Sequence, residues 1–345
     1  MKAMKLISTA ALVFAVFVLP MCASASDAAP AYPNMKIMLA HSGAVTDARH
    51  EMALGFEEYV EEKSGGKVQV EVYPANQLGD SRVAIEAVQQ GGIQVTIAPP
   101  PSASQFIPTL SVMDTPYLFP TDLEKALAVV NGPFGQALLD SCHEYNIHGL
   151  TLLPDLYSAF IATRPLRSAD DFKGKKFRVM ASKVSIKMIE SWGASALFLD
   201  YAEAFNALQT GVVDGLAAGI GAGIYNMKFY EVAKNLILTK HVLSTQVVFC
   251  NKPWYDALDE GTRQLVDDGV AHGKGRAQAK RIADEEKALK AMTDYGTEII
   301  ELPDDVLKDL SDLARQPCID LYLEVAGEKG RELVELVNAE IARVQ

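Results

Sequence analysis

A strand–helix–strand pattern that occurs twice is the feature that most constrains how this chain can fold. The first copy, NQLGDSRVAIEAVQQGGIQVTIAPP, covers residues 76–100, with Asp80 as the predicted helix N-cap. The second copy, LFLDYAEAFNALQTGVVDGLAAG, covers residues 197–219; Asp200 is its predicted cap, and a short strand is predicted at 212–213. Because both modules alternate strand and helix, they predict an α/β protein with two lobes of related construction.

Hydrophobic periodicity predicts the remaining elements. The predicted strands cover 35–42, 68–74, 93–98, 176–180 and 244–250, and the predicted helices cover 46–63, 260–294 and 304–345. Gly269, Gly273 and Gly275 lie inside the long helix, and since glycine disfavours the helical conformation we expect a bend or break there. Ser168 is predicted to cap a short helical turn, with Asp171 completing a capping box.

The first 25 residues have the features of a cleaved secretory signal peptide. Lys2 and Lys5 provide the positive region, residues 6–21 are mainly apolar, and residues 23–25 (ASA) form a small-residue cleavage site. Cys22 offers the alternative of a lipoprotein, but the methionine before it suits lipidation poorly. We therefore expect a periplasmic protein whose mature part, about 320 residues, is long enough for two lobes.

Charge and cysteine content narrow the function classes. The 32 Lys and Arg less Lys2 and Lys5 leave 30 against 44 Asp and Glu, a net charge of −14. Nucleic acid binding requires a basic face, so this balance argues against it, and any anion site has to be built locally. Cys142, Cys250 and Cys318 have no metal-binding spacing; their odd number permits at most one disulfide, and we expect buried thiols.

Signatures of catalysis and of cofactor binding are missing. The sequence contains no GxSxG, HExxH, CxxC or GxxxxGK[ST] motif. The glycine-rich stretches at 219–223 and 269–275 lack the spacing of a dinucleotide or phosphate loop, and the six histidines form no i,i+4 pair. We therefore expect no cofactor, no metal and no enzyme activity, with a zinc site assembled across the fold as the less favoured alternative.

Arg178 is the residue whose chemistry stands out. It lies in the middle of the predicted strand KFRVM, where Phe177 and Val179 share one face and Arg178 and Met180 the other. Two interpretations follow from the residue types alone. Arg178 is either an edge-strand arginine, exposed or paired with an acid such as Asp200, or a clamp that holds a ligand carboxylate through two parallel hydrogen bonds.

Five motifs, taken in chain order, resemble one protein family. They are EEKSGGKVQVEVYPANQLGD, DTPYLF, DDFKGKKFRVMAS, ALQTGVVDGLAAG and KFYEVAKNLILTKH. Over about residues 34–343 the chain resembles the solute-binding subunits of tripartite ATP-independent periplasmic (TRAP) transporters, of the dicarboxylate-binding-protein (DctP) type. The resemblance implies a two-lobe periplasmic binding protein, type II-like, with hinge strands and a long bracing helix.

The resemblance also implies partners and lobe boundaries. The binding protein performs no chemistry; it captures a small organic acid and delivers it to small and large membrane subunits, and an ion gradient drives transport. By similarity, lobe I covers residues 32–155 plus 244–283, and lobe II covers 156–243 plus 284–345.

Site residues follow from the same resemblance. The family arginine that binds the substrate carboxylate falls on Arg178, which favours the clamp. The other positions where members contact the ligand fall on Tyr201, His41, Ser42, Asp80 and Ser81. Ordinary lobe packing is the alternative role for Tyr201, and helix capping is the alternative for Asp80.

Departures from the family pattern bear on the ligand. Compared with sialic-acid-binding members, Ser158 replaces a second arginine, Ala218 an asparagine, and Pro99 and Ser102 charged residues. A buried ligand hydroxyl left without a partner costs about 1–3 kcal/mol, so these losses argue against a sugar acid. We expect a monocarboxylate whose apolar or aromatic body packs on Tyr201, Tyr157, Pro99 and, unless it belongs to the core, Trp192.

The sequence leaves three alternatives to a monocarboxylate-binding transport subunit. A C4-dicarboxylate would need a second cation in the cleft, for which Arg164 and Lys183 are the nearby candidates. A periplasmic subunit that presents its ligand to a sensor kinase would have the same site but a different partner. An exported enzyme is disfavoured by the missing motifs.

Overall fold

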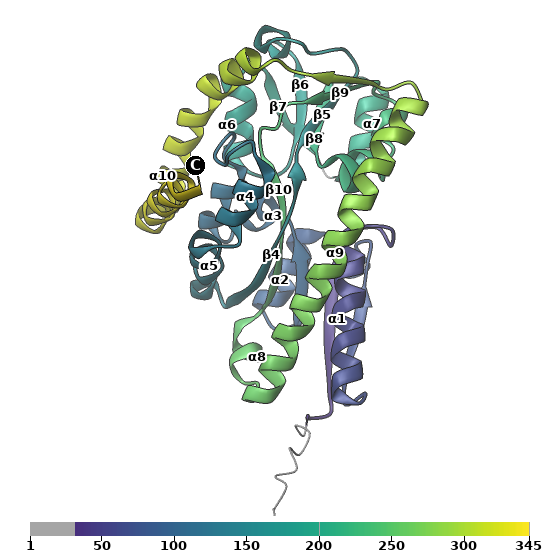
Figure 1. Cartoon of the computed structure of the whole chain (residues 1–345), viewed down its shortest axis with the longest axis vertical. Coiled ribbons are helices and arrows are strands. Elements are labelled where there is room, and N and C mark those ends of the chain that lie inside the picture. The colour runs from purple at the N-terminus through teal and green to yellow at the C-terminus, as the bar shows by residue number, and fades with distance from the viewer. Residues whose placement is uncertain (1–31, 200, 345) are drawn as a thin grey trace, which may run out of the picture. The chain divides into compact units, whose positions relative to one another are not determined.

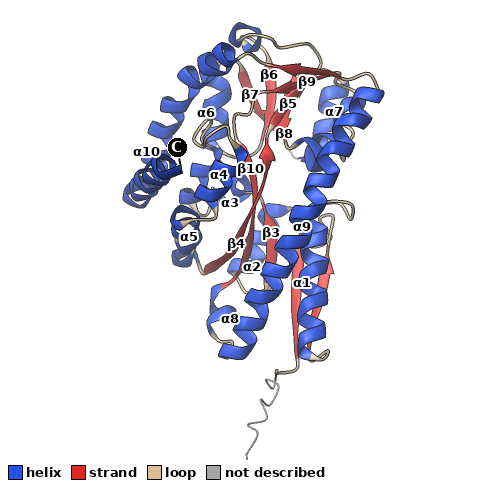
Figure 2. Cartoon of the chain, viewed as in Figure 1, coloured by secondary structure: helices blue, strands red, loops and turns tan. Residues whose placement is uncertain are grey.

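The computed structural model describes residues 32–199 and 201–344, which form two β-sheets with helices packed around them (Figure 1, Figure 2). The predicted signal peptide and Asp200 lie outside these residues. The first sheet has the order β2-β1-β3-β10-β4, with strands Val68–Tyr73, Met35–His41, Val95–Ala98, Leu243–Asn251 and Ile147–Tyr157. The second has the order β11-β9-β5-β8-β6-β7, with strands Glu298–Glu301, Asn235–Leu238, Ala159–Ala162, Gly215–Ala218, Lys176–Val179 and Ser195–Phe198. The predicted two-lobe α/β fold is confirmed.

Among the described residues, six of the ten helices begin where a capping side chain accepts one of their first N–H groups. These ten helices are α1 Ala48–Ser64, α2 Ser81–Gln89, α3 Pro100–Ala103, α4 Leu123–Val130, α5 Pro133–Asp140, α6 Lys183–Ser191, α7 Ala204–Gln209, α8 Lys252–Asp256, α9 Glu260–Asp294 and α10 Asp304–Val344, which is kinked at Gly327. Asp80 caps α2 as predicted and accepts the Val83 N–H at 2.9 Å. The predicted capping box of Ser168 and Asp171 is also present.

Two long antiparallel strands carry the chain from one sheet toward the other. Figure 2 shows β4 and β10 side by side over most of their length, and their backbones are hydrogen bonded. After β4, a single residue, Ser158, leads into β5 of the second sheet. The return connection is almost as short, because β9 of the second sheet precedes β10 of the first. Residues at these crossings therefore lie between the two sheets.

The sequence predicted a bend or break in the long helix, and the break is wrong, because α9 is one continuous helix of 35 residues. Gly269 and Gly273 allow close packing against α1, beside which the helix runs in Figure 1. A Cβ atom at Gly273 would lie 2.4 Å from the Met52 carbonyl oxygen, and one at Gly269 would lie 2.8 Å from a Val60 methyl group. The helix tolerates these glycines because they let two backbones approach, and that packing outweighs their low helix propensity.

Replacing Gly273 by Ala should lower the free energy of unfolding by about 2 kcal/mol, since overpacking a tight contact costs about 1–3 kcal/mol. Gly275 is the matched control in the same helix, because no atom would lie within 4 Å of its Cβ. Gly275→Ala should stabilise the protein by about 0.5–1 kcal/mol through helix propensity alone. Urea unfolding of the two variants measures the difference, and equal effects would contradict the packing role of Gly273.

Several strands were not found in the sequence or were misplaced. The strand predicted at 212–213 is wrong: Val212 is exposed, and the Val213 N–H bonds the Ala207 carbonyl to close the end of α7. The strand that does form in this region is β8, two residues further on. Its sequence, GLAA, lacks the β-branched residues that mark strands. Gly215 is needed there because a Cβ atom would lie 2.7 Å from the Ile161 carbonyl oxygen of β5.

Other sequence expectations can be compared with the described residues. Cys142, Cys250 and Cys318 are buried free thiols, as expected. Within residues 32–199 and 201–344, no three or more His, Cys, Asp or Glu side chains are arranged to hold a metal ion. In the same part of the chain, no helix is both long enough and apolar enough to cross a membrane.

Candidate ligand-binding site

Arg178 is a buried arginine on an inner strand of the second sheet. Strand β6 lies between β7 and β8 and pairs in parallel with both. The predicted alternation is present: the Phe177 ring packs at 5.1 Å from Phe160 and 5.6 Å from Phe172, in the core of this sheet. Arg178 points to the other face, with only 5% of its surface exposed. A permanent charge this far from water requires hydrogen-bonding or charged neighbours.

Tyr201 is the aromatic neighbour of Arg178. The Arg178 guanidinium carbon lies 5.2 Å from the centre of the Tyr201 ring, and its Nε donates to the Leu199 carbonyl at 2.9 Å. The Phe229 ring meets the Tyr201 ring edge to face at 5.6 Å. Burial raises the pKa of Tyr201 to about 12, against the opposing charges of Arg49 and Arg178, so the phenol is neutral and can donate a hydrogen bond. Cation–π attraction and packing thus fix Tyr201 beside Arg178.

Small residues lie next to this pair. Ala218 ends β8 and pairs in register with Ala159 of β5, so Ser158 lies one residue beyond that pair. The Ser158 N–H is bonded to the Val242 carbonyl at 2.8 Å, which fixes its backbone at the crossing between the sheets. Because the side chains at 158 and 218 are short, this part of the second sheet offers a ligand few hydrogen-bonding groups.

A second group of predicted residues lies where β1 of the first sheet ends. His41 is 2% exposed and its Nε2 is 3.2 Å from Nδ1 of His50. Burial, together with the charge of Arg49 and the neighbouring His50, lowers the pKa of His41 to about 4, so the imidazole is neutral near pH 7. Among the described residues its buried Nδ1 has no hydrogen-bond partner. Ser42 and Ser81 are in contact, with their hydroxyl oxygens 3.0 Å apart.

Arg49 is a charged residue near the site that the sequence did not indicate. Asp47 caps α1 and binds the Arg49 side chain through two hydrogen bonds of 2.9 and 2.8 Å. Burial disfavours the charged form of Asp47, but Arg49 outweighs it and lowers the pKa of Asp47. Arg49 also donates to the Ser42 hydroxyl at 3.2 Å, and its charge acts on Tyr201, which begins the short helical turn after β7. Arg49 therefore lies between the two groups of predicted residues.

The other predicted residues take more ordinary places. Asp80 is exposed, and its observed contact is the α2 cap. Pro99 and Ser102 form the turn that begins α3, where the Ser102 N–H bonds the Pro99 carbonyl at 3.0 Å. Trp192 is 1% exposed and donates to the Leu310 carbonyl at 2.9 Å, so it belongs to the core. Tyr157 donates its hydroxyl to the Pro120 carbonyl, and Arg164 and Lys183 are exposed.

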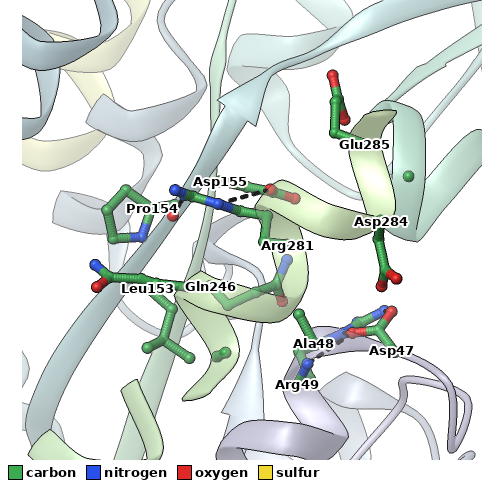
Figure 3. A pocket seen from close by; sticks show the side chains of 13 residues that line it. Asp47, Ala48, Arg49, Leu153, Pro154, Asp155, Gln246, Arg281, Asp284 and Glu285 are labelled. Carbon is green, nitrogen blue, oxygen red and sulfur yellow. Dashed lines mark hydrogen bonds and ion pairs between the residues drawn. The ribbon is translucent and has the colours of Figure 1, made fainter. Parts of the chain in front are cut away.

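A small acidic cavity adjoins Arg49 at the crossing strands. Figure 3 shows Asp155 of β4 facing Arg281 of α9, with Glu285 and Gln246 nearby. Asp155 lies 3.7 Å from the Arg281 Nε. Burial raises the pKa of Asp155 to about 6 and, with the added charge of Asp155, that of Glu285 to about 7. The cavity volume is about 50 Å³, which is enough for a few water molecules. The carboxyl groups of Asp155 and Glu285 are the groups that can bind protons there.

Comparisons with known proteins identify similar sequences and a similar fold. The family model described as bacterial extracellular solute-binding protein, family 7 (DctP), matches residues 39–322. The C4-dicarboxylate-binding periplasmic protein DctP of Rhodobacter capsulatus is 33% identical over 76% of this chain and 78% of its own length. The ectoine-binding periplasmic protein TeaA of Halomonas elongata is 30% identical over 89% of this chain and 90% of its own.

A solved structure has a similar fold over nearly all the described residues. It is the crystal structure of a TRAP periplasmic solute-binding protein from Desulfovibrio salexigens with bound orotic acid. Its TM-score with this chain is 0.86 at 31% identity, and the match covers 90% of this chain and 99% of that one.

Proposed function

The chain belongs to family 7 of the bacterial extracellular solute-binding proteins, the DctP family, and we propose that it captures a small organic acid between its lobes for a TRAP transporter. In this proposal the loaded protein delivers the acid to small and large membrane subunits, and it carries out no chemistry of its own. The periplasmic location of the named relatives supports the predicted export, because such a protein meets its ligand outside the cytoplasm.

The observation that carries the proposal is the buried Arg178 beside Tyr201. A guanidinium remains charged at every physiological pH and presents a planar fork that matches a carboxylate. Its Nε bond to the Leu199 carbonyl and the Tyr201 ring 5.2 Å away hold the fork in one orientation. An arginine fixed in this way loses little conformational freedom when it binds an anion, so more of the interaction energy appears as affinity. In a chain of net charge −12 this cation provides the local attraction that an organic anion needs.

The ligand we propose is a monocarboxylate with an apolar or aromatic body. Tyr201 and Ala218 offer an aromatic face and a methyl group near the Arg178 fork, and Ser158 adds one small hydroxyl. Bound orotic acid in the Desulfovibrio salexigens protein gives an example of a flat acid in a similar fold.

A C4-dicarboxylate is less well supported, although the Rhodobacter capsulatus relative is named for that class. Arg164 and Lys183, the predicted second cations, are exposed. The charge of Arg49 is already balanced by the two hydrogen bonds from its side chain to Asp47. A second carboxylate would therefore have to compete with Asp47 for Arg49.

We also propose the lobe division expected from the sequence. Lobe I, 32–155 plus 244–283, contains the strands β1, β2 and β3; lobe II, 156–243 plus 284–345, contains every strand of the second sheet. The boundaries fall in β4 and near the start of β10, the strands that cross between the sheets. Placing the hinge there is consistent with closure of the lobes around Arg178.

Screening organic acids by thermal shift tests the ligand class. A ligand present at about 100 times its dissociation constant adds about 2.7 kcal/mol to stability, which is easily detected. We expect orotate and other flat monocarboxylates to give larger shifts than succinate, ectoine, galacturonate or sialic acid. If the polyhydroxylated sugar acids gave the largest shifts, our interpretation of Ser158 and Ala218 would be wrong; a preference for succinate would establish the dicarboxylate class instead.

A further inference from the structure

A glycine-rich turn lies between the long helix and the proposed ligand site. Residues Ile220–Tyr225, directly after β8, form a single turn of π-helix, here called the π-turn. The Ile224 N–H bonds the Gly219 carbonyl at 2.9 Å, and the Asn226 N–H bonds the Gly221 carbonyl at 3.2 Å, both across five residues. Such turns are rare in proteins and occur frequently at functional sites.

Two glycines of the π-turn face different neighbours. A Cβ atom on Gly221 would lie 3.5 and 3.6 Å from backbone atoms of Asp284 and Glu285 in α9, which is ordinary contact. A Cβ atom on Gly223 would lie 2.7 Å from the Ala218 methyl carbon and 3.1 Å from the Tyr201 hydroxyl oxygen. Neither glycine has a positive φ angle, so space rather than backbone conformation explains why Gly223 has no side chain.

We propose that Gly223 is a positioning residue for the ligand site, because only a residue without a side chain lets the Tyr201 hydroxyl and Ala218 pack against the π-turn. The proposal rests on the proposed function, in which Tyr201 and Ala218 meet the body of the acid. Gly223 touches no ligand; it acts through these two neighbours.

Tyr201 cannot easily move to make room for a side chain at position 223. The Phe229 ring meets it edge to face at 5.6 Å, and the Arg178 guanidinium carbon lies 5.2 Å from its ring centre. A methyl group at position 223 would therefore move the phenol relative to Arg178. Since the Arg178 fork and the Tyr201 face must both match one small acid, a shift of a few tenths of an ångström changes the fit.

The matched pair Gly223→Ala and Gly221→Ala tests the proposal. Both add one methyl group to the same turn, but the first meets Tyr201 and Ala218, whereas the second makes only ordinary contact with the backbone of α9 beside the small cavity. We expect Gly223→Ala to weaken binding of orotate by about tenfold, measured by calorimetry, and Gly221→Ala to change it less than about twofold. Equal effects, or unchanged affinity in Gly223→Ala, would overturn the positioning role.

A combination of variants separates positioning from a general loss of structure. Tyr201→Phe together with Ala218→Gly removes both atoms that a methyl group at position 223 would meet. In that background Gly223→Ala should cost less than about twofold in affinity, whereas a merely structural role would leave the same tenfold loss. A crystal structure of Gly223→Ala without ligand should show the Tyr201 hydroxyl displaced, and an unmoved hydroxyl would refute the inference whichever acid the protein binds.

The same measurements distinguish this inference from the proposed function. If Arg178→Ala leaves the affinity for every acid unchanged, the proposed site is wrong, while the crystal structure still decides whether Gly223 positions Tyr201. If Arg178→Ala abolishes binding and Gly223→Ala does not weaken it, the site is right and the positioning role is wrong.

Discussion

Replacing Arg178 by Ala should weaken binding of the organic acid at least about 100-fold. Each charge-assisted hydrogen bond contributes about 1.5–3 kcal/mol, so losing a two-bond clamp removes about 3 kcal/mol or more. Titration calorimetry with the best acid from the screen measures the loss. Because we assign Arg178 to the ligand rather than to the fold, the thermal midpoint of the unliganded variant should stay close to that of the wild type.

Two control variants make the Arg178 result specific. Arg178→Lys keeps the charge but not the planar fork, so we expect an affinity between those of the wild type and Arg178→Ala. Arg164→Ala removes an exposed arginine from the same lobe and should leave the affinity unchanged. A large loss of stability in Arg178→Ala with intact affinity would show instead that Arg178 belongs to a structural ion pair.

Lowering the pH from about 8.5 to about 6.5 should let three buried carboxyl groups raise the free energy of unfolding by about 2 kcal/mol. Burial raises the pKa of Asp114 and of Glu285 to about 7, and that of Asp155 to about 6. The folded protein therefore binds protons that the unfolded chain, with ordinary carboxyl pKa values, does not bind in this range. This stabilisation is complete only below the unfolded pKa values and is lost as the pH rises through the folded ones.

Histidines limit the pH window of this gain. Burial lowers the pKa of His41 and His148 to about 4 and that of His241 to about 3. The unfolded chain begins to bind these protons below about pH 7.5 and the folded protein does not, so the histidines offset about 1 kcal/mol of the carboxyl gain by pH 6.5 and lower stability further below it. Urea unfolding at a series of pH values should thus show a maximum rather than a steady rise.

Two substitutions assign the pH dependence to named groups. Asp114→Asn and Glu285→Gln should each remove about half of the gain between pH 8.5 and 6.5, because these two groups titrate inside that window. A wild-type protein that lost stability between these pH values would contradict the assignment, and so would variants with the full wild-type dependence.

The parts of the fold that could be predicted from the sequence are those with clear local signals. The alternating strand over 68–74 and the Asp80 cap are present because both depend on neighbouring residues only. Apart from β6, the short strands of the second sheet were missed: β5 is buried at every position, and β8 reads GLAA. Neither has the alternation that marks a half-exposed strand, β8 has no β-branched residue, and the pairing of both depends on distant partners.

The residues of the candidate site also divide into those with a sequence signal and those without one. Arg178 could be found because a charged residue breaks an apolar strand and a family motif surrounds it. Arg49 could not, since its position depends on the Asp47 cap, on contact with Ser42 and on a lobe distant in sequence. Gly43 leaves room for it, because a Cβ atom there would lie 2.8 Å from the Arg49 Nε. This kind of signal is visible only in three dimensions.

The close contact between α1 and α9 has a consequence for motion between the lobes. Gly55 of α1 and Gly273 of α9 approach so closely that a Cβ atom on Gly55 would lie 2.9 Å from the Gly273 Cα. Two backbones packed at that distance cannot easily slide past each other, so in the proposed lobe division we expect the first half of α9 to move together with α1 and the first sheet. Relative rotation is then left to the residues of α9 beyond this contact, where the helix meets the π-turn. If the lobes move as proposed, we therefore expect α9 to bend near Asp284 and Glu285, where it meets Gly221 of the π-turn.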